Sequence, residues 1–219
     1  TDPAFSPGYF WMWSSKLDEA KLVAQLEDMH AHGLRSVCIH PFPMSFRRGL
    51  YESDMTPDYL TPEYLDVFAK VVERARELGM DAWLYDEGGW PSGGAGGLVA
   101  QGDTAGRFRR RRLRIAADGS PELITEPYEG NPPYPSMIEK GAVESFLSLT
   151  HDAYARKMPD DIGKTVRFTF TDEPAMPAAF NWARTSLGWT ADFDEVFRAK
   201  KGYDLRPHVK ELLARQDET

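Results

Sequence analysis

Tyr85-Asp86-Glu87-Gly88-Gly89-Trp90 is the stretch of this sequence that decides the fold. The largely apolar residues 81–85 predict a buried strand, and this strand ends in two carboxylates and a Gly-rich loop that extends to Gly97. The same pattern recurs where residues 166–171, which predict another strand, run into Asp172-Glu173-Pro174. Two strands that each end in an Asp-Glu pair favour an active site built on carboxylates.

Strands and helices alternate along the whole chain. Strands are expected at residues 9–13, 36–40, 81–85 and 166–171, with helices at residues 15–32, 61–78, 141–158, 192–201 and from 204 onward. This alternation predicts parallel strands joined by right-handed crossovers, in an open doubly wound sheet or in a (β/α) barrel. Polar residues end every strand, where barrels build their sites, so the barrel is favoured.

Four strands are too few to close an eight-stranded barrel, which needs about 250 residues. We therefore expect an α/β fold of the (β/α) TIM-barrel type that is incomplete, with about four parallel strands and an inserted hairpin after the third. Residues 1–219 would form one barrel-like catalytic region, with a hairpin and a Pro-rich excursion inserted at residues 98–140. The unpaired sheet edge of such a partial barrel predicts self-association.

Composition excludes several classes of protein. The net charge of −8 argues against a nucleic-acid binder, and no apolar run is long enough to span a membrane. The Arg-rich residues 107–114 are better explained as an exposed hairpin strand, with its turn at residues 117–120, than as a polyanion patch. The single Cys38 excludes an internal disulfide. A cleaved signal peptide would leave no trace here, so the compartment stays open.

Several motifs occur together in a characteristic order. They are Trp11-Met12-Trp13, His40-Pro41, residues 59–64, residues 85–93, Thr150-His151-Asp152-Ala153-Tyr154, residues 170–174 and Gly202-Tyr203-Asp204-Leu205. In these motifs the chain resembles the N-terminal half of the catalytic barrel of family 106 glycoside hydrolases, the α-L-rhamnosidases, and the match covers nearly the whole chain. The resemblance implies a (β/α)8 domain of a bacterial polysaccharide-degrading enzyme, inverting hydrolysis, and often a calcium ion near the sugar.

Hydrolysis of a glycosidic bond needs one carboxylic acid to protonate the leaving oxygen and one carboxylate to activate water or attack carbon. Glu173 is the candidate general acid, although it could instead form an ion pair or cap a helix. Glu87 is its candidate partner as base, metal ligand or hydroxyl-binding group. Asp172 would orient a neighbour or a sugar hydroxyl, and Asp86 would bind the substrate, with a structural role as the alternative for each.

Aromatic side chains at strand ends are expected to bind the sugar. Trp13 and Trp90 would stack on its C–H faces, Trp182 is a weaker candidate, and His40 would bond a hydroxyl, with core packing as the alternative. No His or Cys cluster has zinc spacing, so no metal ligand is named, although acidic strand ends could hold calcium.

Two other functions use the same residues. A degenerate barrel could hold a carbohydrate with these Trp residues and carboxylates without cleaving it. A barrel enzyme could instead use the carboxylates in metal-dependent isomerisation of a sugar. Turnover of a glycoside distinguishes the hydrolase from the binding protein, whereas loss of sugar interconversion on chelation would identify the isomerase.

Overall fold

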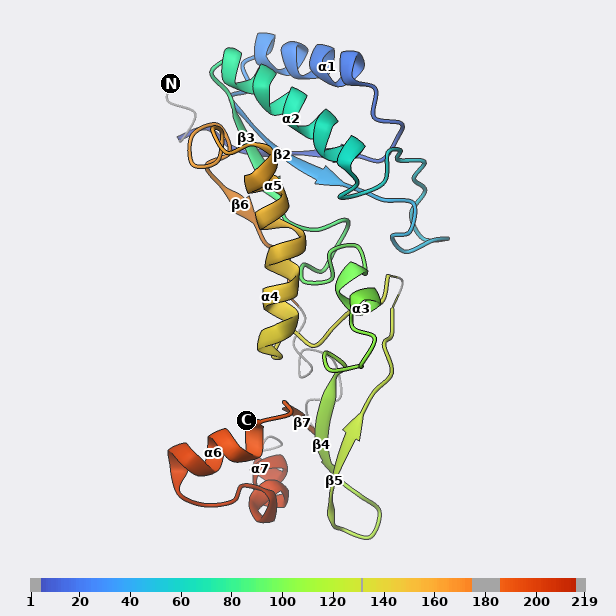
Figure 1. Ribbon diagram of the computed structural model, residues 1–219, viewed down its shortest axis with the longest axis vertical. Helices are drawn as coiled ribbons and strands as arrows, with labels where there is room; N and C mark the ends of the chain where they lie inside the picture. Colours follow the sequence, from blue (N-terminus) through green and yellow to red (C-terminus); the bar gives the residue numbers. More distant parts are fainter. Residues whose placement is uncertain (1–4, 131, 175–185, 216–219) are drawn as a thin grey trace.

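A computed structural model describes residues 5–130, 132–174 and 186–215 (Figure 1). Its elements follow one another in the order β1 (Tyr9–Trp13), α1 (Glu19–Ala31), β2 (Ser36–Pro41), α2 (Pro62–Glu77), β3 (Asp81–Tyr85), α3 (Leu98–Gly102), β4 (Arg111–Ile115), β5 (Pro121–Thr125), α4 (Lys140–Leu149), α5 (His151–Lys157), β6 (Thr169–Phe170), β7 (Ser186–Trp189), α6 (Phe193–Lys201), the 3-10 helix η2 (Arg206–His208) and α7 (Val209–Arg215).

The fold is mixed α/β and contains two sheets. The larger sheet has the order β1-β2-β3-β6, and each neighbouring pair is parallel. The smaller sheet is antiparallel, with the order β5-β4-β7. The four predicted parallel strands and the hairpin after the third are therefore confirmed. Closure of the larger sheet into a barrel stays a prediction.

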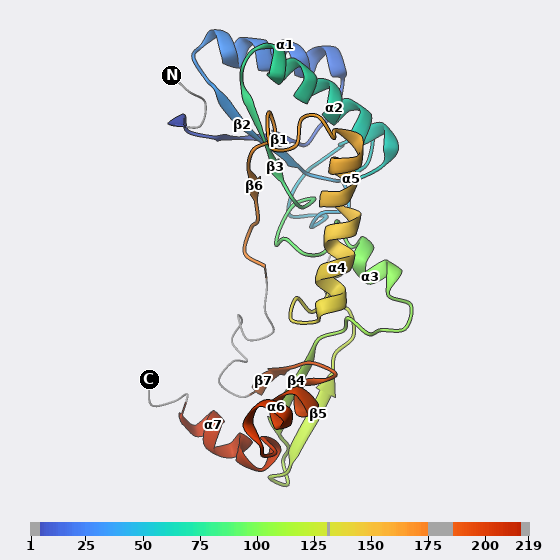
Figure 2. The same ribbon diagram turned by 60° about the vertical axis from the view of Figure 1, so that its left-hand side comes forward.

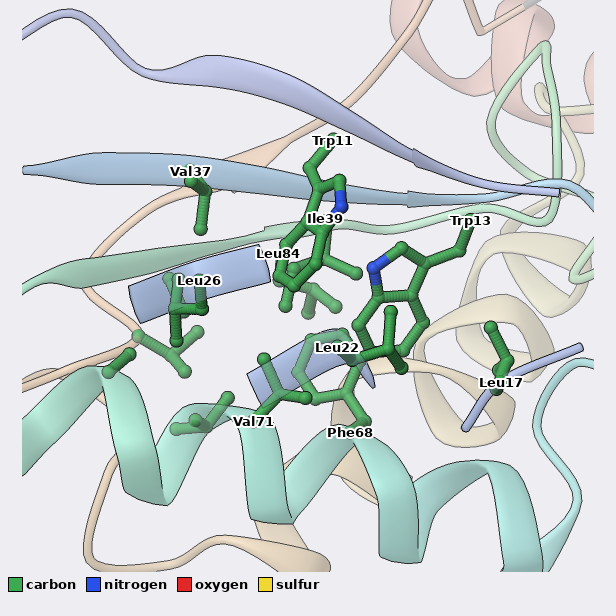
Figure 3. Close-up of a cluster of buried hydrophobic side chains, with 14 of the residues drawn as sticks. Trp11, Trp13, Leu17, Leu22, Leu26, Val37, Ile39, Phe68, Val71 and Leu84 are labelled. Carbon is green, nitrogen blue, oxygen red and sulfur yellow. The ribbon is translucent and has the colours of Figure 1, made fainter. Parts of the chain in front are cut away.

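The core lies between the parallel sheet and the helices on one of its faces. Side chains alternate along each strand, so Trp11 and Trp13 of β1 and Ile39 of β2 all point toward α1 and α2 (Figure 3). Helix α2 supplies Phe68 and Val71, which are fully buried against these strands. This apolar layer fixes the positions of the strands and therefore of the loops that follow them.

On the opposite face of the parallel sheet, no helix among the described residues is packed. Helices α1, α2 and α5 all lie on the same side of the sheet (Figures 1 and 2). On the other side, Phe10 and Met12 of β1 are 55% and 47% exposed. Strands β1 and β6 are also edge strands, since each pairs with one neighbour. Self-association through this open surface stays a prediction.

Helix boundaries follow capping chemistry, with two departures from the sequence prediction. Thr61 caps α2 and Pro62 starts it, as expected, because the Thr61 side chain accepts from the Tyr64 N–H. Helix α1 begins later than residue 15, since its N-cap is Asp18. The helix expected over residues 141–158 is divided into α4 and α5 at Thr150, whose hydroxyl donates to the Phe146 carbonyl.

The Arg-rich segment differs from its predicted place on an exposed strand. Its residues 111–114 lie in β4, which is the central strand of the smaller sheet because β7, a strand that the sequence did not predict, pairs on its far side. Three of its arginines form ion pairs with Glu139, Glu126 and Glu122. This sheet packs on α7 at the end of the molecule opposite the parallel sheet (Figures 1 and 2). Among the described helices, none has the length and apolarity needed to cross a membrane.

Candidate functional site

The carboxyl ends of β3 and β6 meet at one edge of the parallel sheet. The two strands pair in register, with Leu84 opposite Thr169 and Tyr85 opposite Phe170. The pairing continues beyond β3, because the Asp86 N–H donates to the Phe170 carbonyl at 3.2 Å. Both Asp-Glu pairs therefore leave the sheet at the same edge.

Ser92, in the Gly-rich loop, ties the two strand ends together. Its hydroxyl donates to Asp86 Oδ1 at 2.5 Å and accepts from the Asp172 N–H at 2.9 Å. Its own N–H donates to the Asp172 carbonyl at 2.7 Å. Ser92 thus fixes the loop after β3 to the end of β6 by two hydrogen bonds with Asp172, and to the end of β3 by a third with Asp86.

Asp86 is an internal organising residue, which corrects its predicted role in substrate binding. The side chain is 1% exposed, and its second oxygen accepts from the Thr171 hydroxyl at 2.6 Å. His151 Nε2 lies 3.9 Å from the same oxygen. Burial raises the pKa of Asp86, while the hydrogen bonds from Ser92 and Thr171 act to lower it. A carboxylate held this way has no free face for a sugar.

Glu87 accepts hydrogen bonds from the backbone of the Gly-rich loop, and its role as the catalytic partner stays a prediction. Its Oε1 accepts N–H groups from Gly88 and Gly96, and its Oε2 accepts them from Gly93, Gly94 and Ala95, at distances of 2.5–3.1 Å. The side chain is 3% exposed. Five donors occupy both oxygens, so little acceptor capacity is left on this carboxylate.

The glycines of this loop allow its N–H groups to converge on one carboxylate. Gly93, Gly96 and Gly97 all have positive φ, which disfavours residues with a Cβ. Burial raises the pKa of Glu87 to about 7, while N–H groups led by that of Gly96 act in the opposite direction. The loop is thus built around a carboxylate whose ionisation falls near neutrality.

Asp172 lies at the end of the open face of the sheet, next to aromatic rings. The Tyr85 hydroxyl donates to Asp172 Oδ2 at 2.5 Å, and burial together with this hydrogen bond raises the pKa of Tyr85. His40 and Phe170 both stack on Tyr85, with ring centroids 3.5 Å and 5.5 Å from that of the tyrosine. The Asp172 side chain is half-buried, so it can face a ligand and is still oriented by Tyr85.

His40 belongs to the aromatic layer rather than to the solvent. It is 5% exposed, and its Nε2 lies 3.4 Å from the Gly89 carbonyl. Burial lowers the pKa of His40 to about 4, so the ring is neutral at physiological pH. The predicted hydrogen bond to a sugar hydroxyl would therefore have to be made by the other ring nitrogen, Nδ1.

Glu173 is the exposed carboxylate of the two strand ends. It follows Asp172 directly, and no ion pair holds its side chain within the described residues. Its backbone has φ +39°, a conformation that residues with a Cβ rarely adopt. Strain of this kind persists where surrounding structure imposes it, and it is concentrated at functional sites.

The three predicted sugar-stacking tryptophans have different outcomes. Trp13 is a core residue, 2% exposed and packed edge-on against Tyr64 and Phe68, which corrects the prediction. Trp90 is half-buried in a group of rings that includes Tyr51. Trp182 lies outside the described residues.

Sequence reasoning missed the residues that connect the site. Ser92 and Thr171 have common side chains in a loop and at a strand end, where no local signal marks them as partners of Asp86. Tyr85 could have been found. Since strand side chains alternate, the residue after the buried Leu84 must face the opposite side of the sheet, where the open face lies.

No group of three or more His, Cys, Asp or Glu side chains in the described ranges is placed to hold a metal ion. In comparisons with known proteins, no family model matches the chain, and no curated protein matches it either.

Proposed function

We propose that this chain is part of a glycoside hydrolase related to the α-L-rhamnosidases of family 106, with Glu173 as the general acid. One observation carries the proposal: an exposed and a half-buried carboxylate, Glu173 and Asp172, stand next to each other at the open edge of the sheet. A solvent-exposed acid that is not committed to an ion pair in the described part of the chain is free to deliver a proton to a leaving oxygen.

Asp172 is the carboxylate that orients the reacting sugar. Its Oδ2 is occupied by the Tyr85 hydroxyl, so the direction of the carboxyl plane is set before a ligand binds. Within the described residues its Oδ1 accepts no hydrogen bond, which leaves this oxygen for a sugar hydroxyl or a water. The aromatic rings of His40 and Phe170 beside Tyr85 offer apolar surface to the sugar ring.

The arrangement of helices supports a barrel-type region over a doubly wound sheet. A doubly wound sheet has helices on both faces, whereas α1, α2 and α5 share one face here (Figures 1 and 2). In a barrel the inner face of each strand carries side chains that pack in the interior. Phe10, Met12, Tyr85 and Phe170 would be such interior side chains.

The test is hydrolysis of a panel of aryl glycosides, including the α-L-rhamnoside, by the wild type and by Glu173→Gln. Removing the general acid should lower the rate by about 100- to 10,000-fold on substrates with a poor leaving group. The loss should be smaller on substrates with an activated leaving group, because these need less protonation. Glu52→Gln, which changes an exposed glutamate outside this edge, is the matched control. Full activity of Glu173→Gln would refute the assignment.

A binding protein without hydrolytic activity is the second candidate, and the state of Glu87 favours it. Because Asp86 and Glu87 are saturated by internal hydrogen bonds, the described residues present two carboxylates at this edge instead of four. Binding of a glycoside with no turnover by the wild type, and unchanged affinity in Glu173→Gln, would identify the binding protein.

A further inference from the structure

A cavity of about 310 Å³ opens at the Gly-rich loop that follows β3. Four stretches of the chain form its walls: the segment after β2, the Gly-rich loop after β3, the residues before β4 and the Pro-rich segment before α4. Its volume is at the lower limit of small-molecule sites, which suits a single six-membered ring with its substituents. Its lining includes Arg47, Trp90, Arg110, Glu129, Pro133 and Tyr134.

Arg47 is held over aromatic rings in a strained backbone conformation. Its guanidinium carbon lies 4.9 Å from the centre of the Trp90 ring and 5.2 Å from that of Phe46. The residue has φ +43°, and no carboxylate within the described ranges pairs with it. A guanidinium held over aromatic rings can still direct N–H groups at a planar anion, and the strained backbone indicates that this placement is imposed.

A second arginine stands on another wall of the same cavity. The guanidinium carbon of Arg110 lies 5.5 Å from the centre of the Tyr134 ring. Tyr134 is itself fixed, because its hydroxyl donates to the Ser92 carbonyl at 2.5 Å. The cavity wall is therefore anchored to the loop that also organises Asp86 and Asp172.

One guanidinium at this cavity, that of Arg47, has no carboxylate partner within the described ranges and can pair with an anion of charge −1. Against the two guanidinium groups stand two carboxylates, those of Glu129 and Glu87. Both oxygens of Glu87 are occupied by the loop N–H groups, and Glu129 is exposed to solvent. A phosphate with charge −2 would be poorly neutralised here, whereas a carboxylate matches both the charge and the fork geometry of a guanidinium.

From these observations we infer that this cavity binds a small carboxylate-bearing ligand, with Arg47 as its bidentate partner. The flat sides of Trp90 and Pro133 contact the apolar faces of a ring, and Glu129 accepts from a hydroxyl of that ring. The carboxylate could belong to an acidic sugar or to a simple organic acid. Ring hydroxyls favour the acidic sugar, because Glu129 would otherwise face apolar carbon.

The experiment is a ligand-observed NMR titration of the full chain with four probes. The probes are glucuronate, glucose, glucose 1-phosphate and cyclohexanecarboxylate, which separate the contributions of the carboxylate, the phosphate and the hydroxyls. Glucuronate should bind at least about 10-fold more tightly than glucose, since a charge-assisted hydrogen bond is lost with the carboxylate. It should also bind more tightly than cyclohexanecarboxylate, which lacks the hydroxyls.

Variants then assign the binding to the cavity. Arg47→Gln should weaken glucuronate binding by about 10- to 100-fold, and Arg47→Lys, which keeps the charge without the fork, by less. Arg48→Gln removes a neighbouring arginine that does not line the cavity and should change nothing. Circular dichroism of each variant checks that it is folded.

Several outcomes overturn the inference. They are equal affinity for glucose and glucuronate, tighter binding of glucose 1-phosphate, absence of binding by either acid at millimolar concentration, or an Arg47→Gln variant with wild-type affinity. Equal affinity for glucuronate and cyclohexanecarboxylate would overturn the acidic sugar in favour of an organic acid. None of these results depends on hydrolysis, so the proposed role of Glu173 stands or fails separately.

Discussion

Replacing Glu87 with Gln tests whether the carboxylate holds the Gly-rich loop in place. Glutamine has the same shape but presents one acceptor oxygen and one NH2 group where glutamate has two oxygens. In the folded chain one oxygen of Glu87 accepts two backbone N–H groups and the other accepts three. In either orientation, the new NH2 group must face N–H donors that had an acceptor before.

The cost follows from the number of donors left without a partner. In its better orientation the amide replaces the oxygen with two donors, Gly88 and Gly96. Each buried N–H that loses its acceptor costs about 1–3 kcal/mol, so Glu87→Gln should lower the free energy of unfolding by about 2–6 kcal/mol. That is a large part of the about 5–15 kcal/mol that stabilises a typical domain.

Urea unfolding followed by circular dichroism at pH 8 measures this loss, because the wild-type carboxyl, with its pKa raised to about 7, is then ionised. Glu173→Gln makes the same chemical change at an exposed position and should alter stability by less than about 0.5 kcal/mol. Limited proteolysis should cut the Glu87→Gln variant first within residues 88–97. A loss below about 1 kcal/mol, with the loop still protected, would refute the structural role of Glu87.

Ser92→Ala removes a hydroxyl that donates to Asp86 and accepts from the Asp172 N–H, so it should cost about 2–4 kcal/mol in urea unfolding, whereas Ser120→Ala in the exposed hairpin turn should cost far less. His40 has a folded pKa of about 4 against an ordinary 6.5, so the unfolded chain binds more protons between these values. Its contribution to stability should therefore be lost as pH falls from about 6.5 to about 4, by up to about 3 kcal/mol. The raised pKa of Glu87 has the opposite effect, because its contribution to stability is lost as pH rises from about 4.5 to about 7. The effect of His40 is therefore measured as the difference in unfolding free energy between the wild type and His40→Phe at each pH. If this difference in unfolding free energy were the same at about pH 7 and at about pH 4.5, the predicted effect of His40 would be contradicted.

Much of the parallel sheet could be predicted because its physical causes are local. The apolar runs of β1, β2 and β3, the cap at Thr61 and the Pro after it are each written in a few neighbouring residues. Strand β6 was predicted over residues 166–171, but β-structure is limited to Thr169–Phe170. Strand β7 and its pairing with β4 depend on residues about 75 positions apart in the chain, and no local pattern encodes that contact.

The site could be predicted only as a region. That carboxylates gather at the ends of β3 and β6 follows from parallel topology, which brings strand ends to one edge. Which of them remains accessible depends on where the loop N–H groups point, and this is a property of the folded loop. Trp13 illustrates the same limit. The alternation of side chains along β1 assigns Trp13 to one face of the sheet, but only the packing of α2 shows that this face is the core.

The two Asp-Glu pairs are alike in sequence, but their glutamates differ in exposure, and the residues that follow each pair account for part of this difference. Glycines come after Glu87, and their backbone can turn its N–H groups back onto the carboxylate that precedes them. Pro174 comes after Glu173 and has no N–H to donate, so the contact that Gly88 makes with Glu87 has no counterpart at this position. In the described part of the chain Glu87 is 3% exposed, whereas Glu173 is exposed to solvent. For this reason we place the proposed general acid at Glu173 and not at Glu87.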